Sequence, residues 1–335
     1  MAPESDKTVR HWSGEPVTLA LSHYDRHAPL VEGAVTIPGI PLKVMVVGQS
    51  ESGPYGSHRH ARMLNNEEFD IAEVSLSSYL MAKDQGAPFT AIPIFPRRLF
   101  SMSQMWVRKD SGISTPTDLP GKRVGLSTFQ TTLSVLAKAD LERSYKVPWR
   151  DIVWVTAREE TRAFAPHSSV KLERLAAGES LLDAITAGTI DSVMIPHPSR
   201  AFLQNSQLVR LLKDPVAEES RYFREFGYFP IMHTIVFRNE VLQRSPGLAQ
   251  AAFEAFQQSW RIANERWDDP NWSFLAWGRQ AVEKQRKVLG EDIWPNGLEK
   301  NLTNLTWFIQ QSYDQGLIGK PFPPSELFHP SVLEV

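Results

Sequence analysis

The stretch "FDIAEVSLSSYLMA" (69–82) begins with the pattern of a buried strand and ends with that of a helix. The strand is expected over 69–75 and the helix from about Ser77. Between these halves stand Ser75, Ser77 and Ser78, three hydroxyl side chains at the end of a strand. In open α/β sheets, ligands bind beyond the carboxyl ends of the strands, where loops and helix N-termini meet. We therefore interpret this junction as part of a ligand site.

Two roles for these serines remain open. Ser77 or Ser78 caps the helix, which is the commonest use of serine at such a position. Alternatively, the hydroxyls and the free N–H groups of the helix start bind an anionic ligand. The two roles are compatible, because one serine can cap while its neighbours bind.

Short apolar runs alternate with helical patterns along the whole chain, which predicts an α/β fold with mainly parallel strands. The run at 89–95 is interrupted by Pro93, so we expect that strand to be irregular or at a sheet edge. Ser180 and Asp183 predict a capping box for a helix that ends at Gly188. The further strands expected are 17–22, 42–47, 123–126 and 191–195, with a helix over 128–145 and an extended run over 230–241.

The C-terminal third is expected to be helical from Ser245, with Ser245 and Pro246 as cap and first-turn residue. Aromatic and apolar residues then recur at helical spacing as a core stripe: Phe253, Phe256, Trp260 and Ala263. The pattern as a whole predicts two α/β lobes. The first comprises residues 1–104 and 233–335, and the second, residues 105–232, is inserted between them.

Composition narrows the class of protein. The 335 residues carry a net charge of −2, which favours neither nucleic acid nor an anionic membrane as a partner. There are no cysteines, which excludes disulfides, thiolate catalysis and cysteine metal sites. Ten tryptophans leave room for an apolar interface, so a homo-oligomer is compatible with the sequence.

The N-terminal residues are polar and charged from Glu4 to Glu15, with no apolar run of about 7–15 residues to form a signal-peptide core. No window approaches the ~20 apolar residues that a membrane span needs. We therefore expect a cytoplasmic protein, an expectation that a leader upstream of this sequence would reverse.

A second polar junction, "LSTFQTT" (126–132), stands at the start of the helix expected in the second lobe. Its side chains could contact a ligand: Ser127, Thr128, Gln130, Thr131 and Thr132. Two such junctions, one in each lobe, predict an anion-binding cleft between the lobes.

Other segments add charged candidates. "SHYDRHAP" (22–29) places Tyr24, Asp25 and Arg26 after the first strand, although a solvated loop explains them equally well. Of Arg97 and Arg98 in "IFPRRLF", one could form a surface salt bridge and the other a bidentate pair with a carboxylate.

Histidines in three segments are further candidates for the site. His197 lies between two prolines at the end of a strand, whereas His233 could be a ligand contact or a core residue. His58 and His60 form an H-x-H pair, but no nearby Asp, Glu or Cys completes a metal site, so we predict no metal. The sequence also lacks the nucleotide-binding, serine-hydrolase and zinc-protease motifs.

The segments "YDR", "FDIAEVSLSSYL", "AIPIFPRRLF", "DLPGKRVGL", "FPIMHTIV" and "WPNGLE" resemble the 4,5-dihydroxyphthalate decarboxylase family, a branch of the type II periplasmic-binding-protein superfold. The likeness extends from about Val17 to Ser331. It implies a two-lobed fold and a cofactor-free, non-oxidative loss of CO2 from a hydroxylated aromatic acid. On this resemblance Arg97 or Arg98 would clamp a carboxylate. Ser75, Ser77, Gln130 and Thr131 would orient the substrate, and His233 or His197 would be the acid/base.

The chain departs from the family pattern at three places. Ser101-Met102-Ser103 stands where an Arg-His-Ser is expected, Thr128-Phe129-Gln130 replaces a Glu-Tyr-Gln, and His197 replaces an arginine. These changes imply a ligand less anionic than a dicarboxylate, such as a monocarboxylated aromatic. A different class of function stays open as well, because the fold also serves solute-binding proteins of ABC importers that capture an aromatic or small organic anion.

Overall fold

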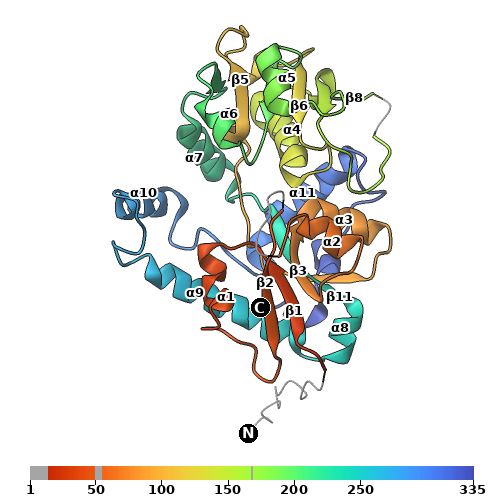
Figure 1. Cartoon of the computed structure of the whole chain (residues 1–335), viewed down its shortest axis with the longest axis vertical. Helices are drawn as coiled ribbons and strands as arrows, with labels where there is room; N and C mark the ends of the chain where they lie inside the picture. Colours follow the sequence, from red (N-terminus) through yellow and green to blue (C-terminus); the bar gives the residue numbers. More distant parts are fainter. Residues whose placement is uncertain (1–13, 50–54, 167–168) are drawn as a thin grey trace. The chain divides into compact units, whose positions relative to one another are not determined.

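The computed structural model describes residues 14–49, 55–166 and 169–335, so most of the polar stretch from Glu4 lies outside the described residues. The chain forms two compact units (Figure 1). The first comprises 1–97, 233–305 and 322–335, and the second 98–232 and 306–321. The chain thus leaves the first unit after Arg97 and returns to it at His233.

A five-stranded sheet forms the centre of the first unit, in the order β2-β1-β3-β11-β4. Its strands are β1 (Val17–Leu21), β2 (Leu42–Val46), β3 (Ile71–Ser75), β4 (Phe89–Ile92) and β11 (His233–Arg238). β1 runs parallel to β2 and β3, whereas β11 runs antiparallel to β3 and β4. The prediction of mainly parallel strands therefore holds for only part of this sheet, because β11 returns through it in the opposite direction.

The first unit also contains six α-helices among the described residues. They are α1 (Ala28–Val31), α2 (Arg59–Leu64), α3 (Leu76–Asp84), α8 (Asn239–Arg244), α9 (Leu248–Arg266) and α10 (Gly278–Leu289). Phe253 and Phe256 of α9 pack in one core cluster with Leu19, Ile71 and Ile235 of the sheet. Phe253 and Phe256 of the expected stripe thus lie in the core and fix α9 against the strands that carry the site, whereas Trp260 is half-buried and lines a hollow.

The second unit contains a six-stranded sheet in the order β10-β5-β9-β6-β7-β8. Its strands are β5 (Met105–Arg108), β6 (Arg123–Leu126), β7 (Val153–Thr156), β8 (Lys171–Arg174), β9 (Ser192–Met194) and β10 (Leu208–Arg210). Its helices are α4 (Thr132–Tyr145), α5 (Leu181–Ala187), α6 (Arg200–Gln204) and α7 (Pro215–Phe226), while α11 (Leu302–Asp314) begins in the first unit.

Several local predictions are confirmed. β4 ends at Ile92, directly before Pro93, and lies at the edge of its sheet. Ser180 and Asp183 form the expected capping box of α5, and Gly188 ends that helix with a φ of 78°. These signals are local, which is why the sequence shows them directly.

Three local predictions are wrong. Ser245 caps no helix start; it ends α8, and α9 begins only at Leu248 after Gly247. Ser77 and Ser78 lie inside the first turn of α3, whose N-cap is Ser75. The helix expected from 128 begins at Thr132, because Thr131 is its cap.

Candidate functional site

A buried carboxylate and a buried histidine meet in the sheet of the first unit. Nδ1 of His233 lies 2.5 Å from Oε1 of Glu73. His233 opens β11 opposite Ser75 of β3, and Glu73 stands two residues before Ser75 on the same face of that strand. Both side chains are almost fully buried. The antiparallel register of these two strands therefore builds the pair.

Arg59 neutralises this carboxylate. Its Nη2 lies 3.0 Å from Oε2 of Glu73, its Nε donates to the Glu73 carbonyl, and both side chains are fully buried. The Ser22 amide donates a further hydrogen bond to Oε2. A buried ion pair with these added hydrogen bonds is rigid, because loss of either partner leaves an unpaired charge in the interior.

The charge states of the pair follow from these contacts. Burial alone would raise the pKa of the Glu73 carboxyl, but Arg59 and His233 outweigh it, so the pKa lies well below its usual range. Burial lowers the pKa of His233 to about 4, against the opposing effect of Glu73. At neutral pH, a neutral imidazole therefore donates its Nδ1 proton to a carboxylate, and Nε2 carries the free lone pair. No other described residue forms a hydrogen bond with that Nε2.

Two further histidines lie near this pair. The ring of His60 meets the ring of His233 edge-on, with centroids 4.8 Å apart. Its buried Nε2 has no hydrogen-bond partner among the described residues. Burial lowers the pKa of His60 well below its usual value, and it lowers the pKa of His27 to about 4. The neighbourhood of Glu73 thus contains three neutral imidazoles.

A chain of polar side chains borders the pair. Nη1 of Arg97 donates to Oε1 of Gln49 over 2.9 Å, and Nε2 of Gln49 donates to the Tyr24 hydroxyl over 3.3 Å. Burial lowers the pKa of Arg97 and raises that of Tyr24, with Glu73 adding to the rise at Tyr24. The Arg97 carbonyl also accepts the amide proton of His233. Arg97 is therefore a cation tied to the histidine strand.

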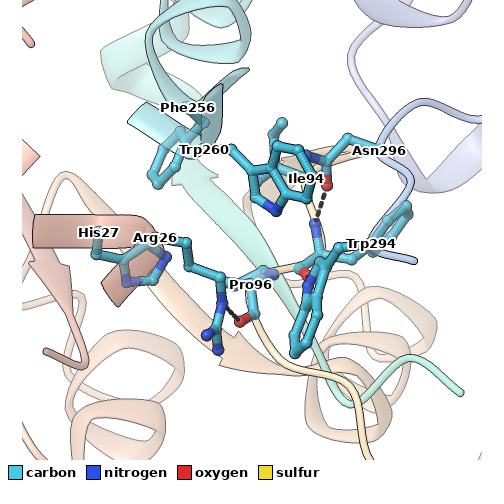
Figure 2. A pocket seen from close by; sticks show the side chains of 9 residues that line it. Arg26, His27, Ile94, Pro96, Phe256, Trp260, Trp294 and Asn296 are labelled. Carbon is cyan, nitrogen blue, oxygen red and sulfur yellow. Dashed lines mark hydrogen bonds between the residues drawn. The ribbon is translucent and has the colours of Figure 1, made fainter. Parts of the chain in front are cut away.

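Arg26 and Asp25 play a structural part. Figure 2 shows the Arg26 side chain reaching toward Pro96, whose carbonyl accepts a hydrogen bond from Nε at 2.5 Å. The guanidinium lies over the rings of Tyr24 and Trp294, and Asp25 accepts a hydrogen bond from Trp267. Arg26 thus holds the Tyr24 loop in place, and the expectation that it contacts substrate stays a prediction.

The serine junction lies in the same unit. Ser75, Ser77 and Ser78 are all buried, at the C-terminal end of β3 and the start of α3. Ser75 lies opposite His233 in the strand register, so its side chain shares a face with the histidine. The structure therefore brings Ser75 together with His233, while contacts of the serines with a ligand remain a prediction.

The junction in the second unit differs from the expectation. The amides of Phe129 and Gln130 donate to the Glu160 carboxylate, and Nε2 of Gln130 donates to it over 2.7 Å. The Thr131 hydroxyl caps α4 by accepting the Ser134 amide proton. Ser127 and Thr132 flank this cluster in the chain. An internal carboxylate thus accepts hydrogen bonds from Gln130, while contacts of this junction with a ligand stay a prediction.

Two other candidates also belong to the second unit. Arg98 is buried, and its Nη1 donates to the Phe229 carbonyl over 2.6 Å. His197 is exposed after β9. Of the two arginines and the two histidines singled out in the sequence, Arg97 and His233 are thus the ones that the structure brings to Glu73. The cleft expected between the lobes stays a prediction.

Sequence reasoning missed Glu73, Arg59 and Gln49. Glu73 is a charged residue in the middle of an apolar strand, which itself signals a buried charge with a required partner. Arg59 lies between His58 and His60, in a segment weighed only as a metal motif. Nothing in the sequence around Gln49 marks it, because its partners come from distant segments.

The described ranges hold no group of three or more His, Asp or Glu side chains that could bind a metal ion. Among the helices of these ranges, none has the length and apolar character that crossing a bilayer requires. The arrangement around Glu73 can orient an imidazole, present its Nε2 for proton transfer, and offer Arg97 to an anion.

Comparisons with known proteins identify relatives of this chain. A family model described as NMT1/THI5 like matches residues 52–144. The 4,5-dihydroxyphthalate decarboxylase of Comamonas testosteroni is 31% identical over 328 residues, which are 95% of this chain and 97% of that protein. The Pseudomonas putida protein of the same name is 31% identical over 220 residues, 63% of this chain and 83% of the relative.

Solved structures share the fold. The aliphatic sulphonate binding protein SsuA of Escherichia coli matches with a TM-score of 0.55 and 14% identity, over 96% of this chain and all of that one. The alkanesulfonate-binding protein SsuA of Xanthomonas axonopodis matches with a TM-score of 0.57 and 12% identity, over 95% and 99%. At these identities the likeness shows the α/β fold of periplasmic solute-binding proteins and nothing about the ligand.

Proposed function

The chain belongs to the 4,5-dihydroxyphthalate decarboxylase family, and from this premise we propose that it catalyses the non-oxidative decarboxylation of a hydroxylated aromatic acid. The observation that carries the proposal is the buried Glu73–His233 pair, which holds an imidazole with its Nε2 unengaged by the described residues. Family membership supplies the reaction, and this pair supplies a proton donor for it.

In the proposed reaction, protonated Nε2 of His233 transfers its proton to the ring carbon that bears the carboxylate. The ring hydroxyl stabilises the resulting cationic ring by electron donation. The bond between ring and carboxylate then breaks, its electron pair restores aromaticity, and CO2 leaves. The ring itself accommodates the charge, so this chemistry needs no cofactor. Each turnover consumes one proton.

The charge state of His233 fits this sequence of steps. Because its pKa is about 4, the histidine is neutral in the free protein at neutral pH. An anionic substrate beside Nε2 favours the imidazolium, so the proton is taken up on binding. Glu73 accepts the Nδ1 hydrogen bond in both states and stabilises the imidazolium that forms.

The other roles follow from the polar chain. Arg97 binds the substrate carboxylate, and Gln49 fixes the guanidinium. We assign the Tyr24 hydroxyl and Nε2 of His60 to contacts with a ring hydroxyl, and Ser75, which lies opposite His233 in the strand register, to the same side of the substrate. These assignments are proposals that rest on the contacts of the first unit alone.

The substrate is proposed to carry one carboxylate. Glu160 accepts the amide protons of Phe129 and Gln130, so those donors are engaged by the chain itself. Ser101, which stands at a departure from the family pattern, donates to Asp140 inside the second unit. At both places the polar groups of the chain are engaged within the second unit, which supports a substrate with one carboxylate.

The test is incubation with a panel of hydroxylated benzoates and phthalates, with CO2 release and ring absorbance recorded. We expect CO2 release from at least one hydroxybenzoate and faster turnover of monocarboxylates than of phthalates. Tight binding of an aromatic anion without turnover of any panel member would support capture for import instead. The cytoplasmic location stays a prediction, which fractionation of producing cells would test.

A further inference from the structure

The hydroxyl of Tyr24 lies where two chains of hydrogen bonds meet, and each of these chains begins at an arginine. In the first, Nη1 of Arg97 donates to Oε1 of Gln49 over 2.9 Å, and Nε2 of Gln49 donates to the Tyr24 oxygen over 3.3 Å. In the second, Nη1 of Arg59 donates to Oγ of Ser22 over 2.9 Å, and the side chains of Ser22 and Tyr24 share a hydrogen bond. All five residues belong to the first unit.

The two arginines fix the direction of these hydrogen bonds, because a guanidinium has N–H donors and no acceptor. Arg97 therefore requires the oxygen of the Gln49 amide, which turns the NH2 group of that amide toward Tyr24. Arg59 occupies a lone pair of Ser22, so Ser22 directs its own proton to Tyr24, and this hydrogen bond acts to lower the pKa of Tyr24. The Tyr24 oxygen thus accepts from both neighbours, and its own proton is left for a third partner.

The described residues supply no acceptor for that proton. Among them, the hydrogen bonds of the Tyr24 hydroxyl are those with Gln49 and Ser22. Both oxygens of the Glu73 carboxylate already accept hydrogen bonds, from His233 and from the Ser22 amide. Burial raises the pKa of Tyr24, so its hydroxyl keeps the proton at neutral pH. A buried donor without an acceptor is unfavourable, so a ligand oxygen that accepts this proton is bound more tightly.

The charges around Tyr24 favour an anion as that ligand. The guanidinium carbon of Arg26 lies 4.0 Å from the centroid of the Tyr24 ring and holds the ring in place. Arg59 is neutralised by Glu73, whereas Arg97 has no ion-pair partner among the described residues. A hydrogen-bond donor beside an unneutralised cation favours the ionised form of an acidic hydroxyl.

We propose that Tyr24 is the specificity-determining donor of this site and that it binds the ring hydroxyl of the substrate in its ionised form. The inference rests on the proposed function, because the decarboxylase reaction supplies the hydroxylated ligand. The proton of the ring hydroxyl is lost to solvent on binding, and the product takes one up as it leaves, so each turnover still consumes one proton.

The ionised hydroxyl changes the intermediate of the reaction. When the proton from His233 adds to the ring carbon, the ring becomes a neutral dienone in place of a cation. The bond to the carboxylate then breaks, its electron pair restores the aromatic phenolate, and CO2 leaves. Electron donation from an ionised oxygen is stronger than from a hydroxyl, so Tyr24 assists the step by stabilising that oxygen as an anion.

A donor-only Tyr24 also distinguishes oxygen from nitrogen on the ring. An amino group donates electrons to the ring as a hydroxyl does, but it is a poor hydrogen-bond acceptor and does not ionise to an anion. Tyr24 therefore selects hydroxylated over aminated aromatic acids, although the ring chemistry alone would admit both.

The test uses 4-hydroxy-3-nitrobenzoate, whose absorption moves to longer wavelength when its hydroxyl ionises. The hydroxyl bound to the wild type should ionise about one to two pH units below that of the free compound, equivalent to ~10- to 100-fold tighter binding of the ionised form. Tyr24→Phe removes the donor and should abolish most of this shift. Gln49→Glu replaces a donor to Tyr24 with an acceptor of its proton and should have the same effect while Tyr24 is still present. Tyr313→Phe, at a tyrosine that is 43% exposed on α11, should leave the shift unchanged.

Ligand titration with 4-hydroxybenzoate and 4-aminobenzoate gives a second readout. The wild type should prefer the hydroxyl compound about tenfold or more, and Tyr24→Phe should remove most of that preference. A purely structural role of Tyr24 would instead weaken the binding of both compounds alike. Circular dichroism establishes that each variant is folded.

The proposal is overturned if the bound hydroxyl ionises at the pH of the free compound, or if the wild type does not bind the nitro compound at millimolar concentration. It is equally overturned if Tyr24→Phe keeps both the shift and the preference. These outcomes are distinct from failure of the proposed function. An ionised bound hydroxyl without CO2 release from any hydroxybenzoate would support the donor role of Tyr24 and contradict decarboxylation, whereas CO2 release with an un-ionised bound hydroxyl would contradict the donor role alone.

Discussion

Glu73 and His233 lie 160 positions apart in the sequence, yet their side chains join at 2.5 Å between Oε1 and Nδ1. The contact arises because β11 pairs with β3 after the chain has completed most of its second unit. Arg59 holds the opposite carboxylate oxygen. The catalytic histidine of our proposal is thus oriented by a group that is itself fixed.

Replacing Glu73 with Gln tests this arrangement. The change keeps the shape of the side chain and leaves Arg59 without a counterion in the interior, so we expect the free energy of unfolding to fall by about 3–5 kcal/mol. Turnover should fall as well, because the amide stabilises the imidazolium poorly. Denaturation with urea measures the first effect. The matched control is Glu68→Gln, which removes an exposed partner of Arg62 and should cost no more than ~1 kcal/mol. Equal stability of the two variants would refute a buried ion pair.

Replacing Arg97 with Ala tests the anion clamp. Loss of a charge-assisted hydrogen bond should raise KM about ten- to hundredfold, and Lys should restore part of the affinity but not the two-donor geometry. Steady-state kinetics and ligand titration measure the change. Arg98→Ala is the comparison, since its guanidinium donates to the Phe229 carbonyl and should affect stability rather than KM. Unchanged substrate affinity in the Arg97 variant would remove that residue from the site.

The buried histidines predict how stability depends on pH. Burial lowers the pKa values of His27 and His233 to about 4, and that of His60 well below its usual value of 6.5. Between about pH 4 and 6.5 the unfolded chain therefore binds more protons than the folded chain, and stability falls as the pH falls through this window. Each histidine contributes a slope of up to ~1.4 kcal/mol per pH unit.

Denaturation at pH 7, 6 and 5 measures this slope. His27→Gln should reduce it by about one histidine's share. A stability that stays constant from pH 7 to 5 would contradict neutral buried imidazoles.

Thr131 separates a capping role from a binding role. Its hydroxyl accepts the Ser134 amide proton at the start of α4. Thr131→Ala should therefore cost about 1 kcal/mol of stability, and Thr131→Ser should cost little, because serine caps equally well. If the Ala variant instead raised KM at unchanged stability, the sequence-based assignment of Thr131 to the substrate would stand.

Those parts of the structure that depend on residues close together in the sequence could be predicted from it. Pro93 stops a strand, Gly188 ends a helix, and Phe253 and Phe256 pack at helical spacing, each through a local cause. The prediction that Ser245 caps the start of a helix was wrong because serine occurs at both ends of helices. Here Ser245 is the C-terminal cap of α8.

The site was visible only in part. His233, Arg97 and Ser75 stand in motifs, but their common neighbour Glu73 requires the pairing of β3 with β11, which no local pattern reveals. The internal partner of Gln130 was hidden for a similar reason. Its polar surroundings suggested a ligand, whereas Glu160, thirty positions away, accepts its hydrogen bonds.

The central claim is that His233 protonates the ring carbon, and CO2 release by His233→Asn and His197→Asn tests it most directly. On a substrate that the wild type converts, the His233 variant should lose about 10²–10⁴-fold in kcat while it still binds the substrate. The His197 variant, altered at an exposed position of the second unit, should keep its kcat. Wild-type CO2 release by the His233 variant, or loss confined to the His197 variant, would contradict the account.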